Sequence, residues 1–519
     1  MMHRPPPQQP RLALLLGAIA AVAFSVRLLP LVVSGTLGGF RGYDDGVHYA
    51  AAVHLLAGSL PYRDFVLVHP PGIALLMAPF ALIGRLVSDS AGIAAARVLV
   101  VVIGTVNAVM VGLLLKKWGY PAVIAGGGLY ALWSVATIAE RSIMLSPILN
   151  ACVLAALLAL RSGQHLVPRR AVTLAAVFLG LALCFKLWAV LPVLVIGVMV
   201  AVRFGPWLLL RFVGVGAVVC TVVMGPFFAV APGAMFTDVI LAQLVRTDGA
   251  SRGLMYRLRD FAGVDAPAVL ILTAAAVGLL CIAATAYAGM AGRRRLRDWG
   301  DEVWWALLAM VISVALLASD SFFDHYPNFV APQLALCLGV TVGAGVAFHS
   351  HRVRSRENQG RGRVSRRGIS VPVATSVISA LLLVPLGVRG YVVEPPPLPH
   401  VNEAAMAAAA APYTCVFATY SYMGVVSDSL SRSMQHGCAS IVDVFGTRMV
   451  EKLRTGVDGA VLPQLLASEL QLGQLKQAQA AAVQEPFPYY GMSQDAIAEL
   501  TSNFVLAASS GSFQIWVRK

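Results

Sequence analysis

Long apolar runs follow one another along this chain of 519 residues and decide what it can fold into. Most approach the ~20 residues that a helix needs to cross the hydrocarbon core of a membrane. They lie at 12–33, 91–115, 120–139, 146–160, 171–185, 187–203, 208–230, 267–288, 303–319, 328–347 and 370–388. With 58% hydrophobic and 12% charged residues, a soluble core cannot hide this surface. The sequence predicts a polytopic α-helical membrane protein of about eleven spans, whose first helix is retained rather than cleaved as a signal peptide.

Basic residues cluster between the apolar runs, and their distribution predicts the sidedness of the chain. The clusters lie at 116–117, 161–170, 203–211, 293–297 and 349–367. All are cytoplasmic, as the positive-inside rule requires, if the N-terminus is cytoplasmic and the further apolar segment 71–87 lies at the interface. If segment 71–87 crosses instead, every cluster moves outside. The net charge of +14 therefore reflects membrane topology and does not indicate nucleic-acid binding.

The composition changes near residue 391, where the linker Glu394-Pro395-Pro396-Pro397 begins a more polar region. This change predicts a transmembrane module over 1–390 and a small C-terminal α/β domain over 391–519, outside the plasma membrane. The β-prone runs lie at 415–420, 440–444, 504–507 and 513–517, and a helical pattern lies at 461–483. Cys415 and Cys438 lie in this region. An extracytoplasmic location permits a disulfide between them but does not require one.

The stretch Gly42-Tyr43-Asp44-Asp45-Gly46-Val47-His48-Tyr49 opens the first outer loop, residues 34–70. Adjacent carboxylates at a membrane face are costly, which favours a functional role. One carboxylate in a cleft can accept a proton from a hydroxyl group, while the other orients a substrate or a cation. The alternative is a solvated turn, because Tyr-Asp-Asp-Gly is also suitable for turns.

The rest of this loop continues with an amphipathic helical pattern at 49–56, then Tyr62-Arg63-Asp64, and ends at His69-Pro70-Pro71. This order of an acidic pair, an interfacial helix and a polar residue before Pro-Pro resembles the first extracytoplasmic loop of the GT-C glycosyltransferases. It is most similar to the branch of the protein O-mannosyltransferases and the bacterial aminoarabinose lipid A transferases. Those enzymes transfer a sugar from a polyprenyl-phosphate carrier to an acceptor hydroxyl or phosphate. The similarity covers about residues 10–200.

The resemblance implies catalytic roles for acidic residues. Asp44 is the expected base, with Asp45 as the near alternative. In the family a second acidic residue lies shortly before a proline, but here Leu145-Ser146-Pro147 has Ser146 at that place. The nearby Glu140 either takes the second acidic role or pairs with Arg141 or Arg97.

The resemblance also implies residues that bind the donor. The family commonly has a lysine where this chain has His69, and a small-residue helix ends in Lys186. With Arg63, these are the candidates for binding the donor phosphate. The candidates for the substrate pocket are Tyr43, His48, Tyr62, Arg141, His325 and Tyr326. The stretch 322–328 has an alternative interpretation as an aromatic belt at the lipid headgroups.

The implied activity is transfer of a sugar, with mannose or arabinofuranose favoured, from polyprenyl phosphate to a glycan, lipid or protein of the cell envelope. Direct displacement by the acceptor inverts the anomeric centre. The sequence identifies no cofactor, and no residues have a spacing specific to a metal, so a divalent cation at the phosphate stays an open alternative. The rival interpretations are a lipid or glycan transporter or flippase and a non-catalytic assembly scaffold. Transporters more often show internal repeats and charged residues at mid-membrane.

Overall fold

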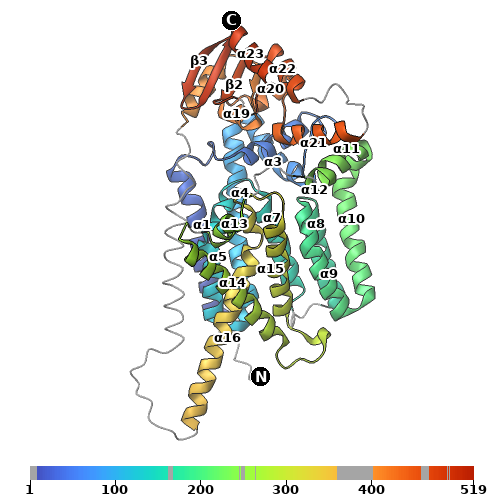
Figure 1. Cartoon of the computed structure of the whole chain (residues 1–519), viewed down its shortest axis with the longest axis vertical. Coiled ribbons are helices and arrows are strands. Elements are labelled where there is room, and N and C mark those ends of the chain that lie inside the picture. The colour runs from blue at the N-terminus through green and yellow to red at the C-terminus, as the bar shows by residue number, and fades with distance from the viewer. Residues whose placement is uncertain are drawn as a thin grey trace.

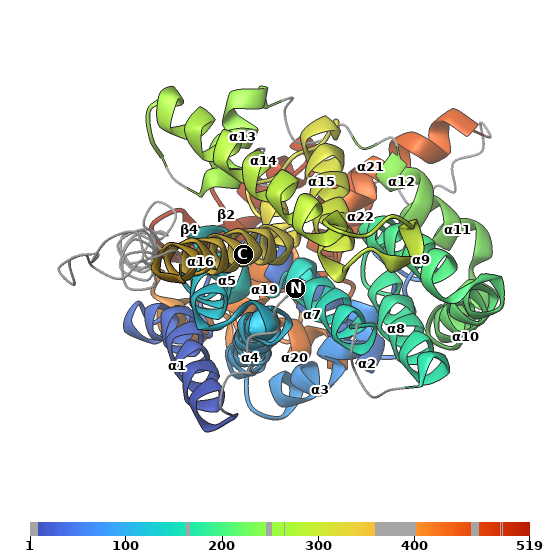
Figure 2. The same cartoon turned by 90° about the horizontal axis from the view of Figure 1, so that it is seen from below.

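The computed structural model describes residues 9–161, 167–244, 246, 252–263, 265–358, 401–457, 467–487, 489 and 491–519. Long helices running in roughly the same direction form most of the molecule (Figures 1 and 2). They are α1 (Gln9–Val33), α4 (Asp89–Leu115), α5 (Tyr120–Leu132), α7 (Leu145–Ala159), α8 (Pro168–Leu183), α9 (Val190–Phe204), α10 (Pro206–Val230), α14 (Ala268–Met290), α15 (Asp301–Ala318) and α16 (Ala331–Asn358).

Within the described residues, seven helices are long and apolar enough to cross a membrane. The number is eight if α5 and the bent segment Ser134–Arg141 form one broken span, at an angle of 50°. Large apolar side chains on α10 and α14, such as Trp207, Val222 and Leu280, have no protein cover and suit contact with lipid. The chain is a multi-pass membrane protein. The predicted count of eleven spans stays a prediction, because α7 and α8 have only 15 and 16 residues and run 370–388 lies outside the described residues.

Shorter elements connect the long helices. At the end of the bundle that carries the sheet, these are α2 (Tyr43–Leu56), α3 (Gly72–Leu86), α6 (Ser134–Thr137), η2 (Ala139–Arg141), η3 (Leu187–Ala189), α11 (Pro232–Phe236), η4 (Thr237–Leu241), α12 (Ala242–Leu244), α13 (Leu254–Ala262) and η6 (Tyr326–Phe329). The elements η1 (Lys116–Trp118) and η5 (Leu296–Asp298) lie at the other end. With 15 residues, α3 is shorter than the ~20 that a span requires. Figure 1 shows α3 beneath the C-terminal part, which agrees with an interfacial position for segment 71–87. Helix α2 packs against α3 and against α19 and α20 of the C-terminal part.

The C-terminal part contains a four-stranded sheet, at the upper end in Figure 1. Its strands are β1 (Val416–Ala418), β2 (Ala480–Gln484), β3 (Phe504–Ser510) and β4 (Phe513–Arg518), in the order β1-β2-β4-β3. Strand β1 is parallel to β2, and the other neighbours are antiparallel. The helices are α18 (Glu403–Ala410), α19 (Ser421–Val426), α20 (Leu430–Gln435), α21 (Val444–Val457), α22 (Ala467–Gln477) and α23 (Gln494–Asn503). Cys415 and Cys438 are joined by a disulfide.

Two predictions for this region were wrong. The helical pattern at 461–483 contains α22, but its end belongs to β2, whose residues are all buried. A central strand covered on both faces lacks the alternation that marks a strand in sequence. The run 440–444 is not a strand. Asp443 precedes α21 and accepts a hydrogen bond from the backbone N–H of Gly446 (2.8 Å), as an N-cap residue does. The predicted boundary at 390/391 lies outside the described residues.

The two ends of the helix bundle carry different groups of charged residues. The first turn of α2 is acidic, and α2 packs against α19 and α20, at the end of the bundle that carries the sheet. At the opposite end, Lys117 pairs with Glu302 (2.7 Å) and Arg203 with Asp301 (2.6 Å). The predicted common face of the first loop and the C-terminal region is therefore present. Which end is cytoplasmic stays a prediction from the basic clusters.

Candidate active site

The acidic pair lies in the first turn of α2, where the helix dipole favours negative charge. The two carboxylates have different surroundings. Asp45 is fully buried and accepts hydrogen bonds from Nε of Arg97 (3.0 Å) and from the backbone N–H of Ile143 (2.6 Å). Asp44 is half-buried and accepts a hydrogen bond from no residue that the structure describes. The two residues are therefore not a solvated turn, and Asp44 keeps its oxygens available.

Arg97, on α4, connects Asp45 with the rest of the first loop and with the C-terminal region. Its guanidinium group donates hydrogen bonds to the carbonyl oxygens of Thr36 and Gly39, both at 2.6 Å. It also donates to the hydroxyl oxygen of Tyr422 on α19 (3.1 Å). A buried charge with this many partners is fixed in place. Asp45 and Arg97 therefore hold the start of α2, and with it Asp44.

Lys186 lies in the break between α8 and η3 and is buried. Its ammonium nitrogen is 4.7 Å from the ring centre of Tyr326 and 5.8 Å from that of Trp188, at distances typical of cation–π contacts. Burial and the charge of Arg246 lower the pKa of Lys186, and Asp44 raises it, with a net value of about 8. Lys186 and Asp44 are thus close enough to interact electrostatically.

Three histidines lie around the same place. The rings of His48 and His69 are 5.7 Å apart, and Nδ1 of His48 is 2.6 Å from the carbonyl oxygen of Ile143. Burial lowers the pKa of His325 to about 4. It also lowers the pKa of His69 well below its usual value, and neighbouring groups lower it further. Those groups are His48, Lys186, Arg246 and His325. The lowered pKa values leave His69 and His325 neutral near pH 7, so the positive charge that suits an anion comes from Lys186 and Arg246.

A small cleft opens beside Lys186. It is lined by Ser146, Leu149, Lys186, Trp188, Leu316, Tyr326 and Phe329. Its walls are mainly apolar and aromatic, with one ammonium group. An apolar chain with an anionic head group fits this chemistry. Ser146, at the place of the family's second acidic residue, lines this cleft and not a separate site.

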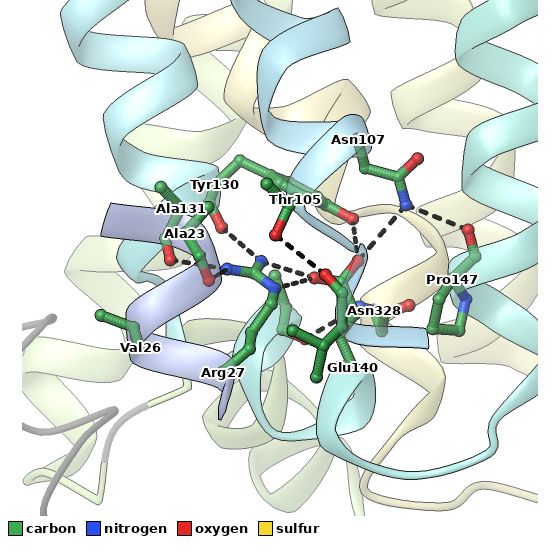
Figure 3. Close-up of polar contacts among 12 residues, drawn as sticks. Ala23, Val26, Arg27, Thr105, Asn107, Tyr130, Ala131, Glu140, Pro147 and Asn328 are labelled. Atoms are coloured by element: carbon green, nitrogen blue, oxygen red, sulfur yellow. Dashed lines mark hydrogen bonds and ion pairs between the residues drawn. The ribbon is translucent and has the colours of Figure 1, made fainter. Parts of the chain in front are cut away.

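Glu140 lies in a different place, inside the helix bundle (Figure 3). It is fully buried and pairs with Arg27 of α1, with Nε of Arg27 2.6 Å from Oε2. Oε1 accepts a hydrogen bond from the hydroxyl of Tyr130 (2.6 Å). Gly104 on α4 leaves room for this carboxylate, because a Cβ there would collide with Oε2. The alternative pairings of Glu140 with Arg141 or Arg97 were wrong, since its partner is Arg27.

Three of the remaining residues predicted for the site do not line the cleft beside Lys186. Arg63 is exposed and forms a two-point pair with Asp64, at 2.8 and 2.7 Å. Arg141 is buried and donates a hydrogen bond to the carbonyl oxygen of Val26 (2.8 Å), next to α1. Tyr62 donates from its hydroxyl to the carbonyl oxygen of His69 (2.8 Å) and therefore fixes the loop that carries this histidine.

Two residues of the site were missed by the sequence prediction. Arg246 has its guanidinium carbon 5.0 Å from the ring centre of Phe323, and its charge acts on Lys186. Asp443 accepts a hydrogen bond from the hydroxyl of Tyr43 (2.8 Å). A single carboxylate within the apolar run 440–444 was the available signal for Asp443. Among the described residues, no group of three or more His, Cys, Asp or Glu side chains is placed to hold a metal ion.

No protein-family model and no curated protein matches the chain. Solved structures do match. ArnT from Cupriavidus metallidurans, bound to undecaprenyl phosphate, superposes with a TM-score of 0.59 at 17% identity over 97% of each chain. The archaeal oligosaccharyltransferase AglB from Archaeoglobus fulgidus, in complex with an inhibitory peptide and a dolichol-phosphate, gives 0.55 at 12% identity, over 98% of this chain and 74% of that one.

The chain has the GT-C fold. This confirms the fold that the first loop predicted, and the two matches extend it over almost the whole chain. In this GT-C structure, the acidic first turn of α2 and the Lys186 cleft lie together at the end of the bundle that carries the sheet.

Proposed function

We propose that the chain is a membrane glycosyltransferase that moves a sugar from a polyprenyl-phosphate carrier to a cell-envelope acceptor on the extracytoplasmic face. The observation that carries the proposal is an available carboxylate, Asp44, interacting with the buried Lys186 beside a mainly apolar cleft. A carboxylate close to a cation that lines such a cleft is what transfer from a lipid phosphate requires. The two structures of similar fold contain undecaprenyl phosphate and dolichol-phosphate, which supports this class of donor.

The reaction needs one base and one group of cations. An acceptor hydroxyl attacks the anomeric carbon of the sugar while Asp44 takes its proton. The bond from that carbon to the phosphate oxygen breaks, and the electron pair leaves with the phosphate. Lys186 and Arg246 stabilise the resulting charge, and His69 donates a hydrogen bond. The products are a glycoside with inverted anomeric centre and polyprenyl phosphate, and the proton on Asp44 returns to water.

The other predicted residues have supporting roles in this proposal. Asp45 positions Asp44 through Arg97, and His48 and Tyr62 position His69. Tyr326 and His325 line the side of the donor. We assign Glu140 and Arg141 to the packing of the helices, and we route no step through a metal ion.

The test uses the full-length protein in lipid nanodiscs with decaprenyl phosphates that carry radiolabelled mannose or arabinofuranose, and envelope extract as acceptor. We expect transfer of one of these sugars. Asp44→Asn should keep the melting temperature and lower transfer by about 10²–10⁴-fold, the usual contribution of a general base. Asp64→Asn, an exposed carboxylate of the same loop, is the matched control and should stay active.

The same experiment separates the rival functions. A flippase would move the labelled lipid across the bilayer without forming a glycoside, and a scaffold would do neither. Full transfer by the Asp44→Asn variant would refute the mechanism proposed here.

A further inference from the structure

Asp443 brings a carboxylate from the C-terminal region to the active site. It is only 5% exposed and lies directly before α21. Its Oδ1 accepts hydrogen bonds from the hydroxyl of Tyr43 and from the backbone N–H of Gly446, both at 2.8 Å. Tyr43 is the residue next to Asp44, and the charges of Asp44 and Asp443 act on each other. Two carboxylates from separate parts of the chain therefore lie on the same side of the site.

The second oxygen of Asp443, Oδ2, has no such hydrogen-bond donors among the described residues, and it is not sealed from the surrounding space. It lies against Gly446, where a Cβ would collide with it. A buried carboxylate with one oxygen fixed and one oxygen open is costly unless another group completes its hydrogen bonding. No described residue supplies that group, so the open oxygen can accept a hydrogen bond from a ligand hydroxyl in place of water.

The site combines two cations with two carboxylates, and Arg246 acts electrostatically on Asp443 as Asp44 does on Lys186. Lys186 and Arg246 suit the phosphate of the donor, so the acceptor belongs with Asp44 and Asp443. An acceptor phosphate would bring a third negative group next to these carboxylates, and like charges in a poorly solvated site repel strongly. A hydroxyl group, in contrast, donates to a carboxylate oxygen.

On the basis of the proposed function, we infer that Asp443 binds the acceptor: its Oδ2 accepts a hydrogen bond from a hydroxyl of a neutral glycan, next to the hydroxyl that Asp44 deprotonates. The acceptor is accordingly a neutral polyhydroxylated chain and not a lipid phosphate. The C-terminal region contributes directly to acceptor choice.

Asp443→Asn tests this inference, because the amide oxygen can still accept from Tyr43 and Gly446. Only the open oxygen changes, from an acceptor to an NH₂ donor. We expect the melting temperature of the full-length protein to stay the same. Its affinity for a neutral probe, octyl α-1,6-dimannoside or an octyl arabinofuranoside disaccharide, should fall about 10- to 100-fold, as for a hydrogen bond to a charged group. Binding of undecaprenyl phosphate should not change.

Two further variants complete the test. Gly446→Ala places a methyl group against Oδ2 and should weaken binding of the neutral probe as well. Asp495→Asn, an exposed carboxylate in the first turn of α23, is the charge-matched control and should bind normally.

Three results would overturn the inference. One is that Asp443→Asn binds the neutral probe within twofold of wild type. The second is tighter binding by wild type of the same disaccharide carrying a 6-phosphate, and the third is no binding of either neutral probe. These measurements concern binding alone. The transfer assay tests the proposed function separately, and that function fails if neither sugar is transferred.

Discussion

Two regions of the molecule combine a buried cation with a carboxylate, and they differ in what remains available. Around Arg27 and Glu140, both carboxylate oxygens and the guanidinium group are engaged by protein atoms (Figure 3). Around Lys186, the ammonium group lies against aromatic rings and Asp44 accepts no hydrogen bond from the described residues. The first arrangement holds helices together. The second leaves a positive and a negative group next to a cleft. A substrate that enters the cleft can form ion pairs or hydrogen bonds with them.

The same difference separates two neighbouring residues. Asp45 is committed to Arg97 and the backbone of Ile143, whereas Asp44, one position earlier, is not. Adjacent acidic residues in a sequence therefore need not share a role. Local hydrogen bonding distinguishes the residue that holds the start of α2 from the residue that we propose as the base.

The largest expected effect comes from removing each carboxylate in turn. Asp44→Asn should lower transfer by about 10²–10⁴-fold without a change in thermal stability, whereas Asp45→Asn should destabilise the protein because it leaves Arg97 buried without its counter-charge. Transfer assays and melting curves on the same nanodisc samples measure both. If the two variants lose stability equally, Asp44 and Asp45 do not differ in role as described here.

Glu140→Gln should act on stability. It leaves Arg27 without its counter-ion in a fully buried position, at a cost of about 3–5 kcal/mol in the free energy of unfolding. Thermal unfolding in nanodiscs measures this. The double variant Arg27→Met with Glu140→Leu should recover part of the loss, because an apolar pair can replace a buried ion pair. If Glu140→Gln instead unfolds normally and is inactive, Glu140 has the catalytic role that the sequence suggested.

The affinity for polyprenyl phosphate should depend on pH through Lys186, whose pKa is lowered to about 8. Below that pH the amine is charged and binds the anion, and above it the charge is lost. Affinity should therefore fall above pH 8 by up to about tenfold per pH unit, the slope for one proton. Lys186→Arg stays charged and should remove this dependence. Binding measured from pH 6 to 10 with labelled undecaprenyl phosphate provides the check, and a flat wild-type profile would exclude Lys186 as the phosphate ligand.

The smallest effect is expected outside both regions. Arg63 is exposed and pairs only with its neighbour Asp64 among the described residues, an arrangement that contributes little. Arg63→Ala should leave the melting temperature and the KM for the donor close to wild type. A large rise in that KM would return Arg63 to the phosphate site proposed from the sequence.

Much of the fold follows from local patterns in the sequence. Apolar runs predicted the long helices, and β-prone runs predicted β1, β3 and β4. The first-loop motif predicted the GT-C fold and pointed to Asp44, and the small-residue helix pointed to Lys186; the roles of both residues stay predictions. These signals work because spans, strands and motifs are determined over few residues.

The residues that sequence analysis missed depend on contacts between distant parts of the chain. Arg27 and Glu140 are 113 residues apart, and Tyr43 and Asp443 are 400 apart. A single sequence contains no local pattern for such pairs. The strand β2 was missed for a related reason, because its burial on both faces comes from neighbours elsewhere in the fold.

The contacts of Arg97 with Tyr422, and of Tyr43 with Asp443, also have a consequence for how the protein is made. Tyr422 and Asp443 follow the described membrane helices in the chain, so they leave the ribosome after them. A chain that is still being made can thus insert these helices while the start of α2 lacks both contacts. The candidate site is therefore completed only when the C-terminal region folds.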